Sequence, residues 1–295
     1  MYEGIRSPAI HVPKTMRDLV SAATRFRNAI YWAGGTYIMS RHDYYPTKDS
    51  YDIISLREIP DFKRINRTDR YLEVGPMVTL NQLASIGKQI VPDPLTQTLH
   101  ELGTRIVRKQ ATIGGALCTP DIRLAISGTL AVLNTEIELK KLDAPHTESR
   151  WVPTGKLYDR NGRLLIAKNE VITRVRMGFD HEDFSYFFCS GNPMVIPDET
   201  VSLTLVCSYN QSVITNFRFC VTLPYGGFHQ FQDIEVLARG TMLPFSAQQI
   251  LRIAKVLIEA IESTNTTISA LQKERVRRIF EMALHQLNTQ SLAER

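Results

Sequence analysis

Two pairs of adjacent glycines, Gly34-Gly35 and Gly114-Gly115, constrain the fold of this chain more than any other feature of its sequence. Because glycine has no Cβ atom, a double glycine lets the backbone turn sharply and lets a ligand approach the main-chain N–H groups. The first pair follows the β-prone run of residues 30–32, and the second leads into an apolar stretch at 124–133. Each pair alone is a weak indication of a phosphate site, and neither matches the dinucleotide-binding or P-loop pattern. Together they predict two similar glycine turns in one domain.

The N-terminal half alternates between helical and β-strand periodicity. Residues 15–29 place apolar side chains at helical spacing, and residues 51–56 are a second β-prone run. The chain is therefore expected to open with a small βαβ-type unit and a parallel or mixed sheet. The further elements expected in this half are a hairpin over 62–66 and 71–75, a helix with Thr79 as its N-cap through 86, a helix over 95–106 and a strand over 136–140.

The pattern changes to antiparallel strands from residue 184 onwards. Residues 201–209 and 213–221 are predicted strands joined by a turn at Asn210-Gln211, and helices are predicted over 246–262 and 267–287. A chain of 295 residues is long enough for two domains. The change in pattern therefore predicts a second α+β domain that begins near residue 180.

Composition and charge narrow the possible classes of function. The net charge is +5 and the pI is about 9.0, but lysines and arginines are interspersed with acidic residues and do not alternate with aromatic ones. This pattern favours a solvated surface over a nucleic-acid interface. No apolar run is long enough to span a membrane and no leader peptide is recognisable, so the cytoplasm is the expected location.

The cysteines and histidines predict no metal site. None of the short spacings that hold zinc or an iron–sulfur cluster occurs among the four cysteines, Cys118, Cys189, Cys207 and Cys220. Two polar groups, residues 42–43 and 181–183, are expected to lie in solvent-exposed loops. No spacing indicates an activated nucleophile.

The glycine turns, taken with their neighbours, resemble the FAD-binding subunit of molybdenum hydroxylases, the family of xanthine dehydrogenase and carbon monoxide dehydrogenase. The family motif A-G-G-T-D-L is similar to Ala33-Gly-Gly-Thr-Tyr-Ile38. The motif I-R-N-x-A-T-I-G-G-N is similar to Val107-Arg-Lys-Gln-Ala-Thr-Ile-Gly-Gly-Ala116. Other segments that resemble the family, in the same order along the chain, are 53–59, 72–79, 130–139, 150–153 and 170–172. The resemblance covers nearly the whole chain, although it is fainter in the C-terminal half.

The resemblance implies an α+β fold with a PCMH/VAO-type FAD-binding domain over residues 1–178, followed by a C-terminal α+β domain of the CO dehydrogenase flavoprotein type over 179–295. The first domain would consist of two subdomains, at about 1–58 and 59–178, with FAD between them. Backbone N–H groups would hold most of the pyrophosphate and the ribityl chain. The residues assigned to the cofactor are Ile30, Tyr31, Trp32, Ala33, Gly34, Gly35, Thr36, Tyr37, Thr112, Ile113, Gly114, Gly115, Ala116, Ile172 and Phe188.

The resemblance also implies partners. A [2Fe–2S] iron–sulfur subunit and a molybdopterin-binding catalytic subunit would deliver electrons to the flavin, and an external acceptor such as NAD would receive them. No side chain of this chain is expected to act as an acid, a base or a nucleophile.

Four side chains depart from the family pattern. Tyr37 and Ala116 replace an Asp and an Asn, Phe188 replaces a Lys near the flavin, and Ala125 stands where an Asp is expected, with Asp121 nearby but out of register. Three lost hydrogen bonds of about 1 kcal/mol each would weaken FAD binding roughly a hundredfold. Two alternatives therefore remain: a structural subunit of the same complex that no longer binds FAD, and a stand-alone flavin oxidoreductase.

Overall fold

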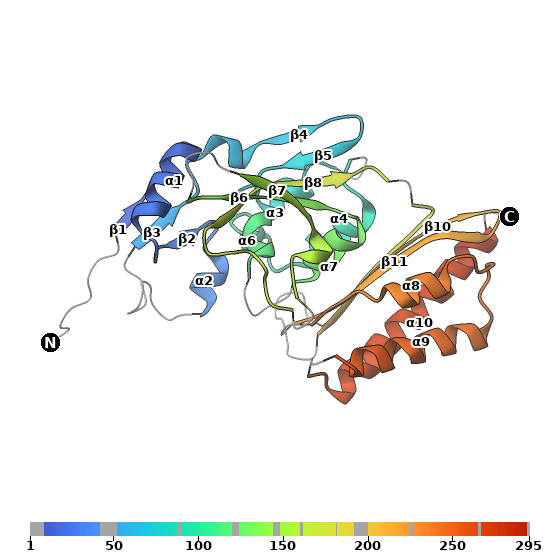
Figure 1. The fold of residues 1–295 in the computed structure, drawn as a ribbon. Coiled ribbons are helices and arrows are strands. Elements are labelled where there is room, and N and C mark those ends of the chain that lie inside the picture. Colours follow the sequence, from blue (N-terminus) through green and yellow to red (C-terminus); the bar gives the residue numbers. More distant parts are fainter. Residues whose placement is uncertain are drawn as a thin grey trace.

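The computed structural model describes residues 9–41, 52–87, 90–119, 124–143, 148–159, 162–180, 182–191, 200–224, 227–264 and 267–293. Three sheets follow one another along the molecule, with strand orders β1-β3-β2, β4-β5-β8-β6-β7 and β12-β11-β10-β9. In Figure 1 the three-stranded sheet lies at one end and the helices α8–α10 lie at the other. Helices and sheets mix throughout, so the α+β expectation is confirmed.

The three-stranded sheet forms the βαβ-type unit predicted from the sequence. Its strands β1 (Ala9–His11), β2 (Ile30–Trp32) and β3 (Asp52–Ser55) are all parallel. The connecting helix α1 (Met16–Arg25) begins at Thr15, whose hydroxyl accepts a hydrogen bond from the N–H of Asp18 in a capping box. Helix α1 ends earlier than predicted, and the three-residue strand β1 was not predicted. The helix α2 (Thr36–Arg41), which follows the first glycine turn, was not predicted.

The five-stranded sheet is antiparallel throughout. Its strands are β4 (Ile65–Arg67), β5 (Tyr71–Val74), β6 (Glu136–Lys141), β7 (Ser149–Pro153) and β8 (Glu170–Gly178). The helices that go with this sheet are α3 (Leu80–Ala84), α4 (Asp93–Glu101), α5 (Arg105–Arg108), α6 (Ile113–Leu117) and α7 (Ala125–Val132). Apolar side chains from the sheet and from α3, α4, α6 and α7 share one buried core, so these helices cover one face of the sheet. Thr79 caps α3 as predicted, although α3 stops short of residue 86.

The single helix predicted over residues 95–106 is wrong. Helix α4 ends at Glu101, and Gly103 has a φ of +64°, a conformation that glycine adopts readily and that a helix cannot contain. Thr104 then caps the separate short helix α5. The side chain of Arg108 fixes this break, because its Nη1 donates hydrogen bonds to the carbonyls of His100 and Gly103 at 3.0 and 2.7 Å.

Helices cover both faces of the C-terminal sheet, with α7 on one face and α8, α9 and α10 on the other. Its strands are β9 (Phe184–Ser190), β10 (Val201–Asn210), β11 (Val213–Leu223) and β12 (Gly227–His229), and they are followed by α8 (Gln232–Ala238), α9 (Ala247–Glu262) and α10 (Ala270–Ala293). The predicted hairpin and the Ser246 cap are confirmed. The turn is shifted by one residue, because Gln211 and Ser212 are the two residues with positive φ.

None of the helices in the described ranges is both long and apolar enough to cross a membrane.

Candidate functional site

A cavity of about 640 Å³ brings the two glycine turns together. The first turn follows β2, and the second leads into α6. The cavity also receives side chains from the segment after β3 and from the end of the short 3-10 helix η1 (Pro60–Lys63). The lining residues are Trp32, Ala33, Gly34, Gly35, Thr36, Met39, Ser55, Arg57, Lys63, Met77, Thr79, Gln82, Lys109, Gln110 and Thr112.

The glycines allow these two turns to touch. A Cβ atom on Gly34 would lie 2.0 Å from the carbonyl oxygen of Gln110, and one on Gly114 would lie 2.7 Å from the Cβ of Pro76. Gly35 has a φ of +72°, and a Cβ there would meet the ring of Trp32 at 2.5 Å. Gly34 and Gly114 are therefore required for close packing inside the protein, which is a different role from the ligand approach predicted from the sequence.

The backbone donors of the two turns differ in their availability. At the second turn, the N–H groups of Ile113 and Gly114 donate to the carbonyls of Val78 and Pro76 at 3.0 and 2.9 Å, and the N–H of Gly115 donates to the hydroxyl of Thr112 at 3.1 Å. At the first turn, no acceptor among the described residues receives a hydrogen bond from the N–H of Gly34, Gly35 or Thr36. An anion in the cavity would therefore find its free backbone donors at the first turn.

The charge of the lining has a single sign. Arg57, Lys63 and Lys109 line the cavity, and no carboxylate does so among the described residues. The sequence analysis did not select these three cations. The position of Arg57 follows from the pairing of β2 with β3. Trp32 and Ser55 are paired at the ends of these parallel strands, so the first glycine turn and the segment with Arg57 leave the sheet at the same edge. The cavity suits a ligand that carries negative charge.

Six of the fifteen residues assigned to the cofactor line this cavity, namely Trp32, Ala33, Gly34, Gly35, Thr36 and Thr112. Ile30 and Tyr31 lie earlier in β2, Tyr37 lies in α2, and Ile113, Gly114, Gly115 and Ala116 lie in α6. Ile172 is 3% exposed and packs in the core on β8, whereas Phe188 is 39% exposed and belongs to the C-terminal sheet. The assignment of all fifteen residues to FAD, including the six that line the cavity, stays a prediction. Ala125 begins α7, and Asp121 and His42-Asp43 lie outside the described residues.

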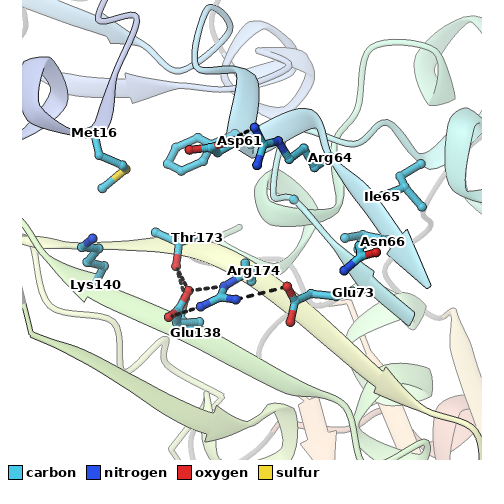
Figure 2. Close-up of a pocket in the computed structure, with 13 residues that line it drawn as sticks. Met16, Asp61, Arg64, Ile65, Asn66, Glu73, Glu138, Lys140, Thr173 and Arg174 are labelled. Carbon is cyan, nitrogen blue, oxygen red and sulfur yellow. Dashed lines mark hydrogen bonds and ion pairs between the residues drawn. The ribbon is translucent and has the colours of Figure 1, made fainter. Parts of the chain in front are cut away.

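A second cavity, of about 720 Å³, lies on the five-stranded sheet, on the face that helices α3, α4, α6 and α7 do not cover. Figure 2 shows its polar side chains joined to one another across the strands. Arg174 binds Glu138 through Nε at 2.7 Å and Glu73 through Nη1 at 3.2 Å. At the rim, Arg64 pairs with Asp61 at 3.1 Å.

A β-bulge produces the arrangement around Glu138. The register between β6 and β8 shifts after Glu138, so that Thr173 and Arg174 both face its carboxylate. Their hydrogen bonds, with that of Arg174 the largest cause, lower the pKa of Glu138 to about 2. This cavity is balanced in charge, in contrast to the first. Its lining has three cationic residues, Arg64, Lys140 and Arg174, and three acidic ones, Asp61, Glu73 and Glu138.

The acidic residues of the polar group at 181–183 stabilise the fold. Glu182 binds Arg218 and Ser208, and the carboxylate of Asp183 accepts a hydrogen bond from the N–H of Tyr209 at 2.8 Å. Both acids thus hold the C-terminal strands together, while His181 lies outside the described residues. The four cysteines are free thiols. Within the described ranges no cluster of His, Cys, Asp or Glu could hold a metal ion.

Comparison with known proteins agrees with the geometry. The family model described as FAD binding domain in molybdopterin dehydrogenase matches residues 5–177. A search of curated protein sequences finds no match.

Three solved structures share the fold over nearly their whole length, each at 16% sequence identity. Carbon monoxide dehydrogenase from Hydrogenophaga pseudoflava has a TM-score of 0.82 and matches 95% of this chain and 96% of its own. Reconstituted CO dehydrogenase from Oligotropha carboxidovorans has a TM-score of 0.81, with coverages of 97% and 99%. Quinoline 2-oxidoreductase from Pseudomonas putida 86 has a TM-score of 0.78, with coverages of 97% and 98%.

The family match spans more than half of the chain and includes both glycine turns and every residue that lines the cavity between them. FAD is the cofactor of this family, as the resemblance predicted. The chain belongs to the family of FAD-binding domains of molybdopterin dehydrogenases.

Proposed function

We propose that this chain is the FAD-binding subunit of a molybdenum hydroxylase complex and that it passes electrons from partner subunits to an external acceptor. The observation that carries this proposal is the cavity at the two glycine turns. Its free N–H groups at Gly34, Gly35 and Thr36 and its purely cationic charge suit a diphosphate. The residues present therefore fit the cofactor of the family.

The residues of the chain have a binding role in this proposal. The N–H groups of the first turn would donate hydrogen bonds to the diphosphate. The donors of the second turn are already engaged, so this turn would hold the first in position through the contact between Gly34 and Gln110. Bound FAD supplies both one-electron and two-electron transfer, which suits a junction between iron–sulfur clusters and a two-electron acceptor. The described side chains of the lining include no carboxylate, histidine, cysteine or tyrosine.

Partners follow from the same proposal. A [2Fe–2S] subunit and a molybdopterin subunit would deliver the electrons, because within the described ranges the cysteines of this chain form no group that could hold a cluster of its own. NAD is the proposed acceptor. The free thiols of all four cysteines support a reducing compartment such as the cytoplasm.

We also propose the division into an FAD-binding domain at 1–178 and a C-terminal domain at 179–295. The family match at 5–177 supports this boundary. So does the change of sheet between Gly178, the last residue of β8, and Phe184, the first of β9.

Purification of the native complex tests the proposal. We expect a yellow complex that contains FAD, an iron–sulfur subunit, a molybdopterin subunit and this chain, with a flavin that is reduced when the substrate of the complex is added. A complex of the same subunits that contains no flavin would instead identify a structural subunit. A flavin-loaded monomer that turns over a substrate without partners would identify a stand-alone oxidoreductase.

A further inference from the structure

Three cationic side chains from three separate segments meet at the first cavity. Arg57 follows β3, Lys63 ends η1 and Lys109 follows α5. All three residues are exposed and line the cavity, and none has an ion-pair partner among the described residues. The acidic residue nearest to Lys63 in the sequence, Asp61, pairs with Arg64 at the other cavity.

This concentration of charge is unfavourable unless an anion balances it. Like charges around one cavity repel one another, and the cavity walls focus their field on the space between them. The unengaged N–H groups of Gly34, Gly35 and Thr36 add further positive potential to the same space. The geometry therefore favours a ligand with at least two negative charges.

We propose that Arg57, Lys63 and Lys109 anchor the diphosphate of FAD by charge. Their attraction takes the place of the hydrogen bonds that the Asp and Asn of the family would make at positions 37 and 116, where this chain has Tyr37 and Ala116. This inference rests on the proposed function, because it takes FAD as the ligand. It requires FAD affinity to fall as salt increases, since ions screen exposed charges. It also requires ADP, which carries the same diphosphate, to compete for the cavity.

Replacement of the three cations by glutamine tests the inference. Full-length protein is stripped of flavin, and its affinity for FAD and for ADP is measured by titration at low and high salt, for the wild type, for Arg57→Gln, Lys63→Gln and Lys109→Gln, and for the triple variant. Each single change is expected to weaken FAD binding about three- to fivefold, and the triple change roughly thirtyfold or more. ADP affinity should fall in parallel, and the salt dependence should flatten in the triple variant.

Matched controls remove the same charge elsewhere. Arg17→Gln, Lys168→Gln and Arg252→Gln change exposed cations that line neither cavity. These variants should keep wild-type affinity and salt dependence. The flavin-free triple variant should melt at the same temperature as the wild type or higher, because the repulsion within the cavity is removed, which separates a binding effect from a folding defect.

The outcomes distinguish this inference from the proposed function. If wild-type protein binds FAD and the triple variant binds it equally well with the same salt dependence, the charge anchor is wrong while the proposed function stands. If wild-type protein binds no FAD, both are wrong. Weaker binding in the cavity variants and in the charge controls alike would also overturn the anchor, since it would reflect the overall charge of the protein.

Discussion

His229 is a side chain whose protonation is decided by burial alone. It is 3% exposed on β12, its ring stacks on Phe231 with centroids 5.9 Å apart, and its Nε2 has no partner among the described residues. Burial lowers the pKa of His229 to about 4, because the charged ring would lose its hydration. The neutral ring is therefore part of the folded state.

His229 should make stability depend on pH in a defined window. The pKa of His229 in the folded state, about 4, lies below the value of 6.5 in the unfolded state. The stability that the neutral ring contributes to the folded state is therefore complete above pH 6.5 and is lost as the pH falls from 6.5 to 4. We expect His229→Phe to remove roughly 3 kcal/mol of this pH dependence, measured by urea unfolding between pH 4 and 7. The exposed His285→Asn serves as the control. An unchanged slope in His229→Phe would show that His229 is not buried in its neutral form.

Glu138 titrates in a lower pH window. Its pKa of about 2 lies below the ordinary 4.5, so the stability from its bonds to Arg174 and Thr173 is complete above pH 4.5 and is lost as the pH falls towards 2. Glu138→Gln should lower the free energy of unfolding by about 1–3 kcal/mol at pH 7, and the difference from wild type should vanish near pH 2. Glu148→Gln, which breaks the exposed pair with Lys141, should have little effect. Equal losses in the two variants would contradict the role of the bulge.

At the scale of elements, the glycine turns illustrate how a motif for ligand binding also serves packing. A Cβ on Gly34 would lie 2.0 Å from the carbonyl oxygen of Gln110, and backbone on both sides prevents an easy shift. Gly34→Ala should therefore separate the two turns, lower stability by about 2 kcal/mol or more and reduce flavin content. Gly178→Ala is the matched control, because the nearest atom to its Cβ would be Asp180 Oδ1 at an ordinary 3.6 Å. Wild-type stability and flavin content in Gly34→Ala would refute the close contact.

The short elements were the hardest to predict from the sequence. Capping residues identified the starts of α3 and α9 correctly, because a capping box is a local interaction within four residues. The strands β7 and β8 were not predicted as strands, although β8 is long and rich in β-branched residues. The split between α4 and α5 depends on Gly103 and on the reach of Arg108 to two carbonyls, which periodicity cannot show.

At the scale of the whole molecule, the two proposed domains share buried structure. Helix α7 packs against β10 and β11, and the hydroxyl of Thr129 lies 2.8 Å from those of Thr98 and Thr204. Gly128 lets α7 approach the sheet, since a Cβ there would lie 2.9 Å from Thr222 Cγ2. Both faces of the C-terminal sheet are therefore covered, which explains the nearly continuous burial along β10.

This shared core predicts that the chain unfolds as one unit. Calorimetry of the full chain should show a single transition, and Gly128→Ala should lower its midpoint although alanine favours a helix by about 1 kcal/mol. Gly128→Leu should lower the midpoint further. Two separate transitions in the wild type, or a rise in the midpoint with alanine, would mean that the two domains are only loosely joined.

The sequence by itself determined the local features of this protein: the glycine turns, the helix caps, the hairpin in the C-terminal half and the motifs that resemble an FAD-binding family. These depend on residues within a few positions of one another. Only the tertiary structure decided that the donors of Ile113, Gly114 and Gly115 are engaged while those of Gly34, Gly35 and Thr36 are free, and that Arg57, Lys63 and Lys109 meet at one cavity. Both depend on which distant segments pack together, since a hydrogen-bond partner and a local electric field are properties of neighbours in space.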